Sequence, residues 1–464
     1  MAVLPFENVG GDPDEEFFSE GVAEEIRSAL ARVPSLRVAS RTSSERYVEM
    51  GATTRRIGAE LLVGSLLEGS VQRAGERLRV TVRLVDTRTD EHLWSDSYER
   101  RLAMESLFDV EEDIARSVAR ALEVELAGAP DAVLVSRPAV SLRAHDLYLL
   151  GLYHWNRRTG EELRRAADFF RSAIEREPGY ALAHAGLANT HVLMPLYAGV
   201  PSAEAMPAAR RAAEEALALD GTLAEAHAAL AFVKTTHDWD WAGAEEGFLR
   251  AIELNPSYAT AHEWYGVLLD AVGRREEARA QLERAVALDP LSIILNAVLG
   301  AHFTFEGDYP ASIEQLERTL ELQRDFPLGL QFLALACLQA GRYRQAEEAL
   351  LSWAERTGTA AEPWTAIVAG IESPGRRDGG VEALDRLVER GILSPYRTAQ
   401  YGSLLGDAAR ALEALERGLE EKDFLMFWID PDPAFDPLRD EPRYRAILEA
   451  MGLDAARAAV GGGR

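Results

Sequence analysis

A group of residues suited to metal binding occurs once in the chain, at His237-Asp238-Trp239-Asp240-Trp241. These residues fall in the turn between two expected helices, where an aspartate can cap the next helix and the tryptophans can pack against it. His184, His227 and His262 occupy one position of a repeat, so successive copies lie one helix pair apart, too far to share a metal. We therefore interpret these residues as capping and packing groups and predict no metal site.

Nucleophilic side chains lack the neighbours that would activate them. Ser19-Glu20-Gly21 has no glycine two residues before the serine, and no histidine precedes His92, so it is not a nucleophile elbow. The single cysteine, Cys337, lies in an apolar run and is expected to be buried. Val9-Gly10-Gly11-Asp12-Pro13 lacks the spacing of a phosphate-binding loop. The sequence thus predicts no catalytic residue and no cofactor.

Acidic residues outnumber basic ones by 76 to 50, which gives a net charge of −26. A field of this sign repels phosphate backbones, so we do not expect nucleic acid as a partner. Arg79 and Arg83 would share one face of a strand, and this basic face keeps a nucleic-acid-associated role as a minor alternative. Ion pairing with the acidic remainder of the chain is the interpretation we favour.

The compartment follows from what the sequence lacks. No apolar stretch approaches the ~20 residues of a spanning helix, no secretory signal is visible, and one cysteine cannot form a disulfide within the chain. These features favour the cytoplasm. Folded structure is expected to begin at once, at Val3, Leu4 and Phe6, as in a fragment. An extracytoplasmic location, downstream of a membrane span, is the alternative.

A repeat of 34 residues must position most of the side chains named above. The spacing recurs in four series: Gly273, Gly307 and Gly341; Gly266, Gly300 and Ala334; Ala278, Ser312 and Ala346; Leu282, Leu316 and Leu350. Each unit predicts two helices. A glycine such as Gly273 ends the first helix in the left-handed conformation, and Pro290 stops the second. Small residues such as Gly266 are expected where paired helices cross, because they let the axes approach to roughly 8 Å.

The small–small–large–small–proline order resembles the tetratricopeptide repeat over residues 144–422. The resemblance implies an all-α, right-handed superhelix of about eight helix pairs, with an insertion at Met194 to Met206. Residues 423–464 are expected to form a C-terminal cap and tail. Trp428 to Pro437 cannot be a regular helix, and a solenoid must cover its last apolar face. An exposed docking site is the alternative interpretation of this segment.

Residues 1–127 predict a small α/β domain, joined to the repeats by a linker at 128–143. Strands are expected at Ala2 to Phe6, Leu36 to Ala39 and His92 to Tyr98, and a helical stretch at 43–59. Between these, Leu78 to Val85 alternates apolar and polar side chains, as a half-buried strand does. With helices around Phe18 to Leu30 and Leu107 to Leu122, the predicted order is βαβαβββα, a mixed sheet with helices on its faces.

Several segments of this domain are similar to the family that resembles the N-terminal domain of TolB. They are Ala2-Val3-Leu4-Pro5-Phe6-Glu7-Asn8, Phe18-Ser19-Glu20-Gly21, Leu36-Arg37-Val38-Ala39-Ser40-Arg41-Thr42-Ser43, Leu67-Glu68-Gly69-Ser70-Val71 and His92-Leu93-Trp94. In that family the domain commonly precedes tetratricopeptide repeats and often follows a signalling head: a winged helix, a nucleotide cyclase or a protein kinase. The resemblance implies an accessory role in bacterial signalling.

The sequence predicts a non-catalytic protein-interaction scaffold, the sensory or regulatory part of a bacterial signalling or transcription-regulating protein. First helices of stacked pairs line a concave groove. The repeat register places six residues in it: Trp155, Asn189, Glu225, Glu263, Asp270 and Gln331. This set holds acids and amides but no lysine or arginine, so a basic or apolar peptide is the expected partner. The alternative is an accessory module of a cyclase, kinase or winged-helix regulator, in which the α/β domain senses a small ligand.

Overall fold

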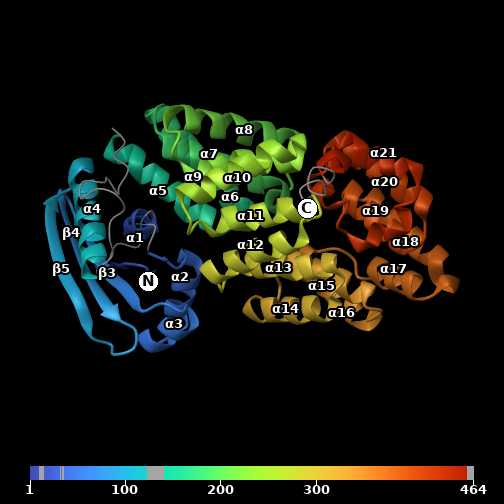
Figure 1. Ribbon diagram of the computed structural model, residues 1–464, viewed down its shortest axis with the longest axis horizontal. Helices are drawn as coiled ribbons and strands as arrows, with labels where there is room; N and C mark the ends of the chain where they lie inside the picture. The colour runs from blue at the N-terminus through green and yellow to red at the C-terminus, as the bar shows by residue number, and fades with distance from the viewer. Residues whose placement is uncertain (10–14, 32, 34–35, 123–139, 457–464) are drawn as a thin grey trace.

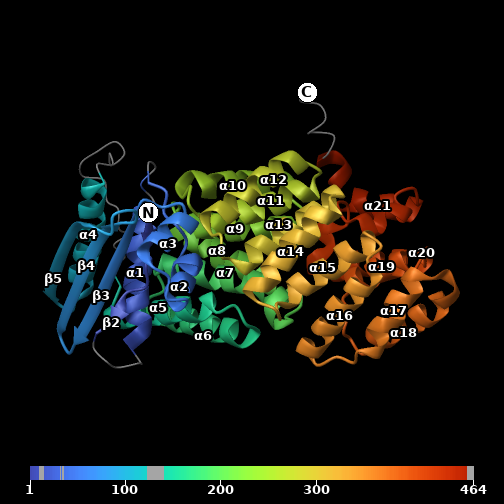
Figure 2. The same ribbon diagram turned by 90° about the horizontal axis from the view of Figure 1, so that it is seen from below.

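The structure is a computed structural model that describes residues 1–9, 15–31, 33, 36–122 and 140–456. An α/β domain lies at one end, a long stack of helix pairs follows, and the C-terminal helices lie at the other end (Figures 1 and 2). The predicted pair Gly10-Gly11 and most of the predicted linker lie outside the described residues. Within the described residues, no helix is long and apolar enough to cross a membrane.

The α/β domain is built on a mixed, five-stranded sheet. Its strands are β1 Ala2–Val3, β2 Glu7–Asn8, β3 Ser65–Ala74, β4 Arg77–Asp86 and β5 His92–Arg101. Strands β1 and β2 pair with β3 in parallel, and β3, β4 and β5 are antiparallel neighbours. Four helices accompany the sheet: α1 Glu16–Ala31, α2 Arg41–Glu49, α3 Thr54–Glu60 and α4 Met104–Ala121. The predicted mixed sheet with helices is confirmed.

Strand β4 shows why the antiparallel part of the sheet has one buried face. Leu78, Val80, Val82 and Leu84 are fully buried and alternate with exposed or partly exposed polar residues. Successive side chains of a strand point to opposite faces, so the four apolar residues meet the same layer. Helices α1 and α4 contact the sheet and each other, and together they form the core of this domain.

The structure differs from the predicted element order in three places. The first strand is interrupted at residues 4–6, where Pro5 has no N–H to donate to a sheet. Residues 36–39 form no strand, although the Ala39 amide donates to the Met1 carbonyl oxygen at 2.8 Å. The helical stretch predicted at 43–59 is two helices, α2 and α3, separated by a turn in which Gly51 has a φ of +62°.

The remaining chain forms eight consecutive helix pairs between residues 142 and 421. The pairs are α5 Leu142–Asn156 and α6 Gly160–Arg176; α7 Ala181–Ala198 and α8 Ser202–Leu219; α9 Ala224–Val233, extended by the π-helix η2 Lys234–Asp238, and α10 Trp241–Leu254; α11 Ala259–Ala271 and α12 Arg275–Leu288; α13 Ile293–Glu306 and α14 Tyr309–Leu322; α15 Pro327–Gln339 and α16 Tyr343–Thr357; α17 Glu362–Glu372 and α18 Arg377–Glu389, preceded by the 3-10 turn η3 Pro374–Arg376; and α19 Pro395–Leu404 and α20 Ala408–Glu421. The predicted insertion at 194–206 lengthens α7 and α8 to 18 residues each.

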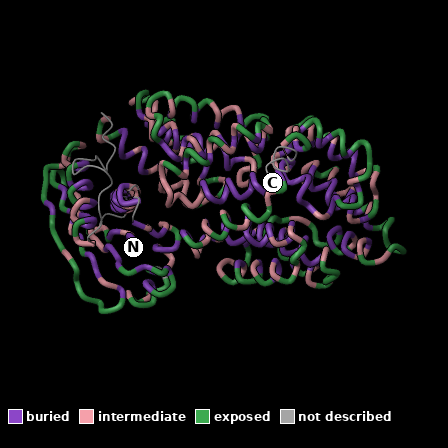
Figure 3. The backbone as a smooth tube through the Cα atoms, viewed as in Figure 1, coloured by how far each residue is buried: buried purple, intermediate pink, exposed green. Residues whose placement is uncertain are grey.

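The repeat glycines act as the sequence predicted. Gly273 and Gly307 follow the first helices of their pairs with φ values of +81° and +82°, a conformation that favours glycine. Gly266 lies where α11 crosses α12: a Cβ atom there would come within 2.7 Å of Leu282 Cγ. Buried residues run along the inner sides of the stacked helices and exposed residues along their outer sides (Figure 3).

The C-terminal segment comprises η4 Phe424–Trp428, η5 Pro433–Leu438 and α21 Pro442–Ala450. It contacts the last helix pair, and it also turns back along the first helices of earlier pairs. Trp428 packs on Phe305 of α13 and Phe332 of α15, each with ring centroids 5.5 Å apart, and Phe427 packs on Phe232 of α9. The segment therefore covers apolar surface on the inner side of the stack, besides that of the last pair.

Candidate functional site

The α/β domain is docked on two separate parts of the helix stack. Next to the first pair, Arg73 of β3 forms an ion pair with Asp146 of α5, at 3.2 Å. At the fourth pair, the Ser40 amide donates to the Leu288 carbonyl oxygen at 3.1 Å, and the Ser43 hydroxyl donates to Asp289 at 2.5 Å. The domain thus bridges the first and fourth helix pairs.

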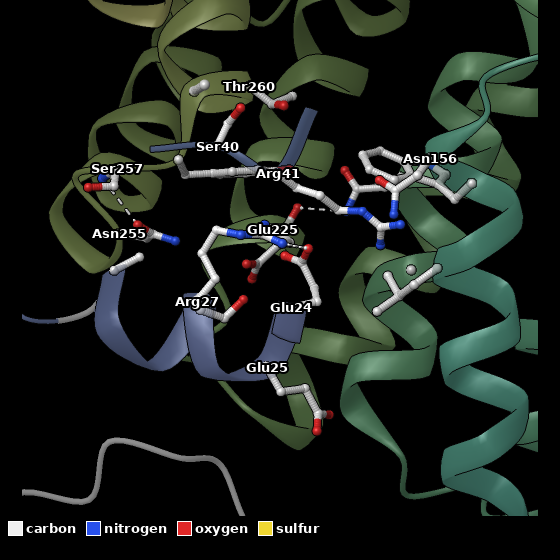
Figure 4. Close-up of a pocket in the computed structure, with 18 of the residues that line it drawn as sticks. Glu24, Glu25, Arg27, Ser40, Arg41, Asn156, Glu225, Asn255, Ser257 and Thr260 are labelled. Carbon is white, nitrogen blue, oxygen red and sulfur yellow. Dashed lines mark hydrogen bonds and ion pairs between the residues drawn. The ribbon is translucent and has the colours of Figure 1, made fainter. Parts of the chain in front are cut away.

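A cavity of about 270 Å³ lies beneath this bridge (Figure 4). One wall comes from α1 and from residues 38–42, and it includes Arg27, Ser40 and Arg41. The other wall comes from the helix pairs, mainly from the end of α5, the inner face of α7 and the starts of α9 and α11. The two walls belong to segments far apart in sequence, so only the docking of the domains creates the cavity.

Three of the six predicted groove residues line this cavity: Trp155, Asn189 and Glu225. The repeat register placed them on the inner face of the first helices, and the structure brings them together under the α/β domain. Their role as partner-binding residues stays a prediction.

Of the other three predicted residues, Glu263 is buried, and Asp270 and Gln331 have side-chain partners inside the protein. Glu263 is 4% exposed and Asp270 is 2% exposed, and Asp270 faces Nδ1 of His302 at 2.8 Å. The Gln331 side chain accepts a hydrogen bond from Arg397, at 3.0 Å. Buried side chains such as Glu263 and Asp270 are not offered to an outside partner in this conformation.

Most charged groups of the cavity wall are already neutralised. Arg27 forms an ion pair with Glu24 at 2.5 Å, and Arg41 pairs with Glu20 and Glu45. Burial raises the pKa of the Asp289 carboxyl, while hydrogen bonds from the α2 region, including that of Ser43, act to lower it.

Two charged side chains of the cavity stand apart from these pairs. Arg158 makes no direct ion pair with the described residues, but its side chain hydrogen-bonds to that of Tyr197. Its charge acts on the buried carboxyls of Glu263 and Asp289. Its guanidinium lies 4.9 Å from the ring centre of Trp155. Its φ of +45° is unusual for a residue other than glycine. Glu225, at the start of α9, lines the cavity (Figure 4), and its side chain has no ion-pair or hydrogen-bond partner among the described residues.

Two buried polar atoms of the wall also lack partners within the described residues. Asn189 is 5% exposed; its Nδ2 donates to the carbonyl oxygens of Ala185 and Glu225, which leaves its Oδ1 without a donor. Exchanging the side-chain nitrogen and oxygen of Asn189 would place an oxygen against two carbonyl oxygens, so these contacts fix the orientation of the amide. The Nε1–H of Trp155 has no acceptor. Buried polar groups are normally hydrogen-bonded, so both atoms call for an explanation.

Three buried carboxyls lie on or next to the cavity wall: Glu25 lines it, Glu111 neighbours Glu25, and Glu263 neighbours Arg158. Burial raises the pKa of Glu263 to about 7, against the opposing effect of the nearby Arg158 charge. Burial also raises the pKa of Glu111 well above its usual value, and the neighbouring Glu25 adds to this effect. Burial would raise the pKa of Glu25 too, but His145, whose Nε2 lies 2.9 Å from its Oε1, outweighs that effect and lowers it.

The histidines singled out by the repeat are structural, as predicted. His184, His227 and His262 each donate from Nε2 to the carbonyl oxygen six residues earlier, at 3.0, 3.0 and 3.2 Å. Asn296, one repeat further on, makes the same contact with Pro290 at 2.9 Å. These side chains therefore tie the start of each first helix to the turn before it.

The remaining residues considered from the sequence take up capping, core and surface positions. Asp240 caps α10 by accepting from the Gly243 amide at 3.1 Å, and Trp241 is buried, as expected for that turn. Cys337 is buried, also as expected. On the outer sheet face, Arg79 pairs with Glu99 at 3.1 Å, whereas Arg83 forms no ion pair with the described residues.

Sequence reasoning missed Arg158 and the whole α/β wall. Arg158 follows the end of α5, outside the repeat positions that register could place on the inner face. Arg27, Ser40 and Thr42 reach the cavity only through the docking of their domain. The sole signal was the segment around Ser40, which carries part of the resemblance to TolB-like domains.

Comparisons with known proteins leave the family of this chain open. No family model matches the chain. A curated protein of Rhizobium meliloti (strain 1021), named putative adenylate cyclase 3, is 34% identical over 237 residues, which is 50% of this chain. The chain matches 39% of the length of that protein.

Solved structures of tetratricopeptide proteins are similar to parts of the chain. TTC0263, a thermophilic TPR protein of Thermus thermophilus, is 19% identical and covers 42% of this chain and 99% of its own, with a TM-score of 0.36. YrrB, a TPR protein with an unusual peptide-binding site, is 22% identical and covers 40% and 90%, with a TM-score of 0.27. The human IFIT1 dimer with m7Gppp-AAAA is 15% identical and covers 77% and 79%, with a TM-score of 0.47. The helix pairs of this chain, and not these scores, define its repeat architecture.

Proposed function

We propose that the chain is a non-catalytic interaction scaffold that serves as the regulatory part of a larger bacterial signalling protein. The observation that carries this proposal is the bridge from the α/β domain to both the first and the fourth helix pairs. A binding event that moves either contact must alter the curvature between these pairs, because packed helices do not deform independently. Such a connection suits a module that transmits a signal.

The similarity to a putative adenylate cyclase supports the regulatory setting. The predicted TolB-like character of the α/β domain belongs to this proposal, as do the attachment to a cyclase, kinase or winged-helix head and the cytoplasmic location. A protein or peptide partner is expected on the helix stack. The net charge of −26 favours a basic segment over an acidic one, since opposite charges steer and retain the partner.

Peptide binding tests the scaffold role directly. The immobilised full chain is offered basic, apolar and acidic peptides of equal length, in low and high salt. We expect retention of basic or apolar peptides, with the basic ones released by salt because screening weakens exposed charge pairs. An acidic helical protein without repeats is the control for non-specific attraction. Equal retention of all three classes, or by the control, would contradict the proposal.

Small-ligand sensing is a second candidate, favoured specifically by the cavity between the α/β domain and the helix pairs. A ligand held there would contact both walls and stabilise their docking. We expect it to protect the amides of residues 38–43 and 255–260 from hydrogen exchange. Protection restricted to one wall would count against a sensing role that involves both domains.

A further inference from the structure

We infer that the cavity between the α/β domain and the helix pairs binds a small zwitterion that carries one carboxylate and one ammonium group, with a free α-amino acid as the ligand class. The inference deepens the ligand-sensing function proposed above and rests on it. The test below measures ligand binding to this chain by itself. A failure to bind the ligand can therefore be distinguished from a failure to transmit a signal.

The first step is the size of the cavity. Small-molecule sites in proteins generally measure about 300–1,000 Å³, so a cavity of about 270 Å³ suits a compact ligand rather than a nucleotide. Its lining mixes aromatic groups, such as Trp155 and Tyr258, with charged and amide groups. A compact ligand with both polar and apolar parts fits this lining.

The second step is a pair of cavity charges that form no direct ion pair within the described part of the protein. Arg158 and Glu225 both line the cavity, on different helix pairs, and neither has an ion-pair partner among the described residues. Arg158 has the carboxyls of Glu263 and Asp289 nearby, neither of them in direct contact with it, and a partly buried charge without a contacting counter-charge is costly. One ligand with a negative and a positive group would compensate both residues together.

The third step is the pair of unsatisfied buried atoms. The Trp155 Nε1–H lacks an acceptor, and Arg158 stacks over the same ring. The Asn189 Oδ1 lacks a donor. Asn189 itself is bonded to the backbone of Glu225. A hydrogen-bond donor, Trp155, therefore lies with Arg158. A hydrogen-bond acceptor, Asn189, lies with Glu225. A carboxylate suits the first pair and an ammonium the second.

Other ligand classes leave a conflict. A multiply charged anion such as a nucleotide would face Glu225 and the carboxylates of Glu24 and Asp289. A simple amine would leave Arg158 without a contacting anion, and a simple carboxylate would leave Glu225 without a contacting cation. A neutral apolar molecule would bury all four polar groups without partners, at a cost for each.

The test uses the full chain and the free proteinogenic L-α-amino acids as probes. Each is screened at millimolar concentration for a rise in melting temperature, and those that raise it are titrated by calorimetry. For each such amino acid, the matching amine and the matching carboxylic acid are titrated in parallel. We expect saturable binding of at least one amino acid and at least about tenfold weaker binding of its singly charged analogues, because each loses a charge-assisted hydrogen bond.

Variants then locate the site. Glu225→Gln and Arg158→Met are each expected to weaken binding by about 10- to 100-fold. Glu215→Gln and Arg390→Met, which change exposed residues on α8 and after α18, are matched controls that should bind as the unmodified chain does. Thr260→Phe fills the cavity without changing its charge and should abolish binding. It serves in place of Arg158→Met if that variant does not give the circular dichroism spectrum of the folded chain.

Three results would overturn the inference. One is the absence of saturable binding by any amino acid. Another is equal binding of the singly charged analogues. The last is unchanged affinity in folded Glu225→Gln and Thr260→Phe variants, which would place the ligand elsewhere.

Discussion

The Ser43 hydroxyl donates a hydrogen bond to Oδ1 of Asp289 at 2.5 Å, and so joins the α/β domain to the end of the fourth helix pair. The same hydroxyl oxygen accepts from the Leu291 amide at 2.8 Å. Both atoms of the first bond are buried, although the residues are 246 positions apart. This bond adds to a hydrophobic core that the α/β domain shares with the first helix pair, including Tyr148, Leu149 and Phe170.

Ser43→Ala is expected to weaken this docking. The change leaves the buried Asp289 carboxylate and the Leu291 amide each short of one partner, which costs about 1–3 kcal/mol for a buried polar group. The free energy of unfolding, measured in urea, should fall by that order, and residues 36–49 should exchange amide hydrogens faster. Ser95→Ala, on the exposed strand β5, is the control. Equal effects of the two changes would show that the contact does not hold the domains together.

Gly266→Ala tests the close crossing of α11 and α12. The new Cβ would come within 2.7 Å of Leu282 Cγ, and overpacking of this kind costs about 1–3 kcal/mol. That cost exceeds the roughly 1 kcal/mol by which alanine is favoured over glycine inside a helix.

Gly379→Ala is the matched control for this change, because Gly379 also lies in a helix, α18, and a Cβ atom added there would have nothing within 4 Å. The control should stabilise the chain by about 0.5–1 kcal/mol. Urea unfolding measures both variants. Stabilisation by Gly266→Ala would contradict the expected collision.

Glu263→Gln should change how stability depends on pH. The pKa of Glu263 is raised to about 7 by burial, so the unfolded chain gives up this proton at lower pH than the folded chain does. The wild-type chain therefore loses stability as the pH rises from about 4.5 to about 7, by at most about 3 kcal/mol. The glutamine variant lacks this loss.

Urea midpoints of the two proteins, compared across this pH range, check the prediction for Glu263. The variant should gain stability relative to the wild type as the pH rises, and the gain should level off above about pH 7. Glu215→Gln, an exposed change on α8, should show no such trend. A difference between wild type and Glu263→Gln that does not vary with pH would rule out an ionisation of Glu263 in this range.

Trp428→Ala should release the C-terminal segment from the inner side of the stack. The indole packs between Phe305 and Phe332, at 5.5 Å from each ring, and removing a buried aromatic side chain costs about 3–5 kcal/mol. Limited proteolysis should cut within residues 424–438 faster. Leu249→Ala, at a side chain that is half exposed on α10, should change stability by less than about 0.5 kcal/mol. Unaltered proteolysis of the tryptophan variant would show that other contacts hold the segment.

The sequence by itself determined the helix pairs, because each pair is a local structure. The spacing of Gly273, Gly307 and Gly341 marks helix ends, and Gly266 and Leu282 meet within one unit of the repeat. Contacts between neighbours in sequence leave a period that can be read directly. The same reasoning predicted the alternating strand β4 and an aspartate cap in the turn at 237–241, which the structure assigns to Asp240.

Only the tertiary structure decided what covers the inner face of those pairs. A pattern of apolar and polar residues reports which side of a helix is buried, but it does not name the distant segment that buries it. Register placed Trp155, Glu225 and Gln331 on the same inner face. The α/β domain returns over the first two and encloses a cavity, while Arg397 binds the third. These contacts join residues far apart in the chain, and no local period encodes them.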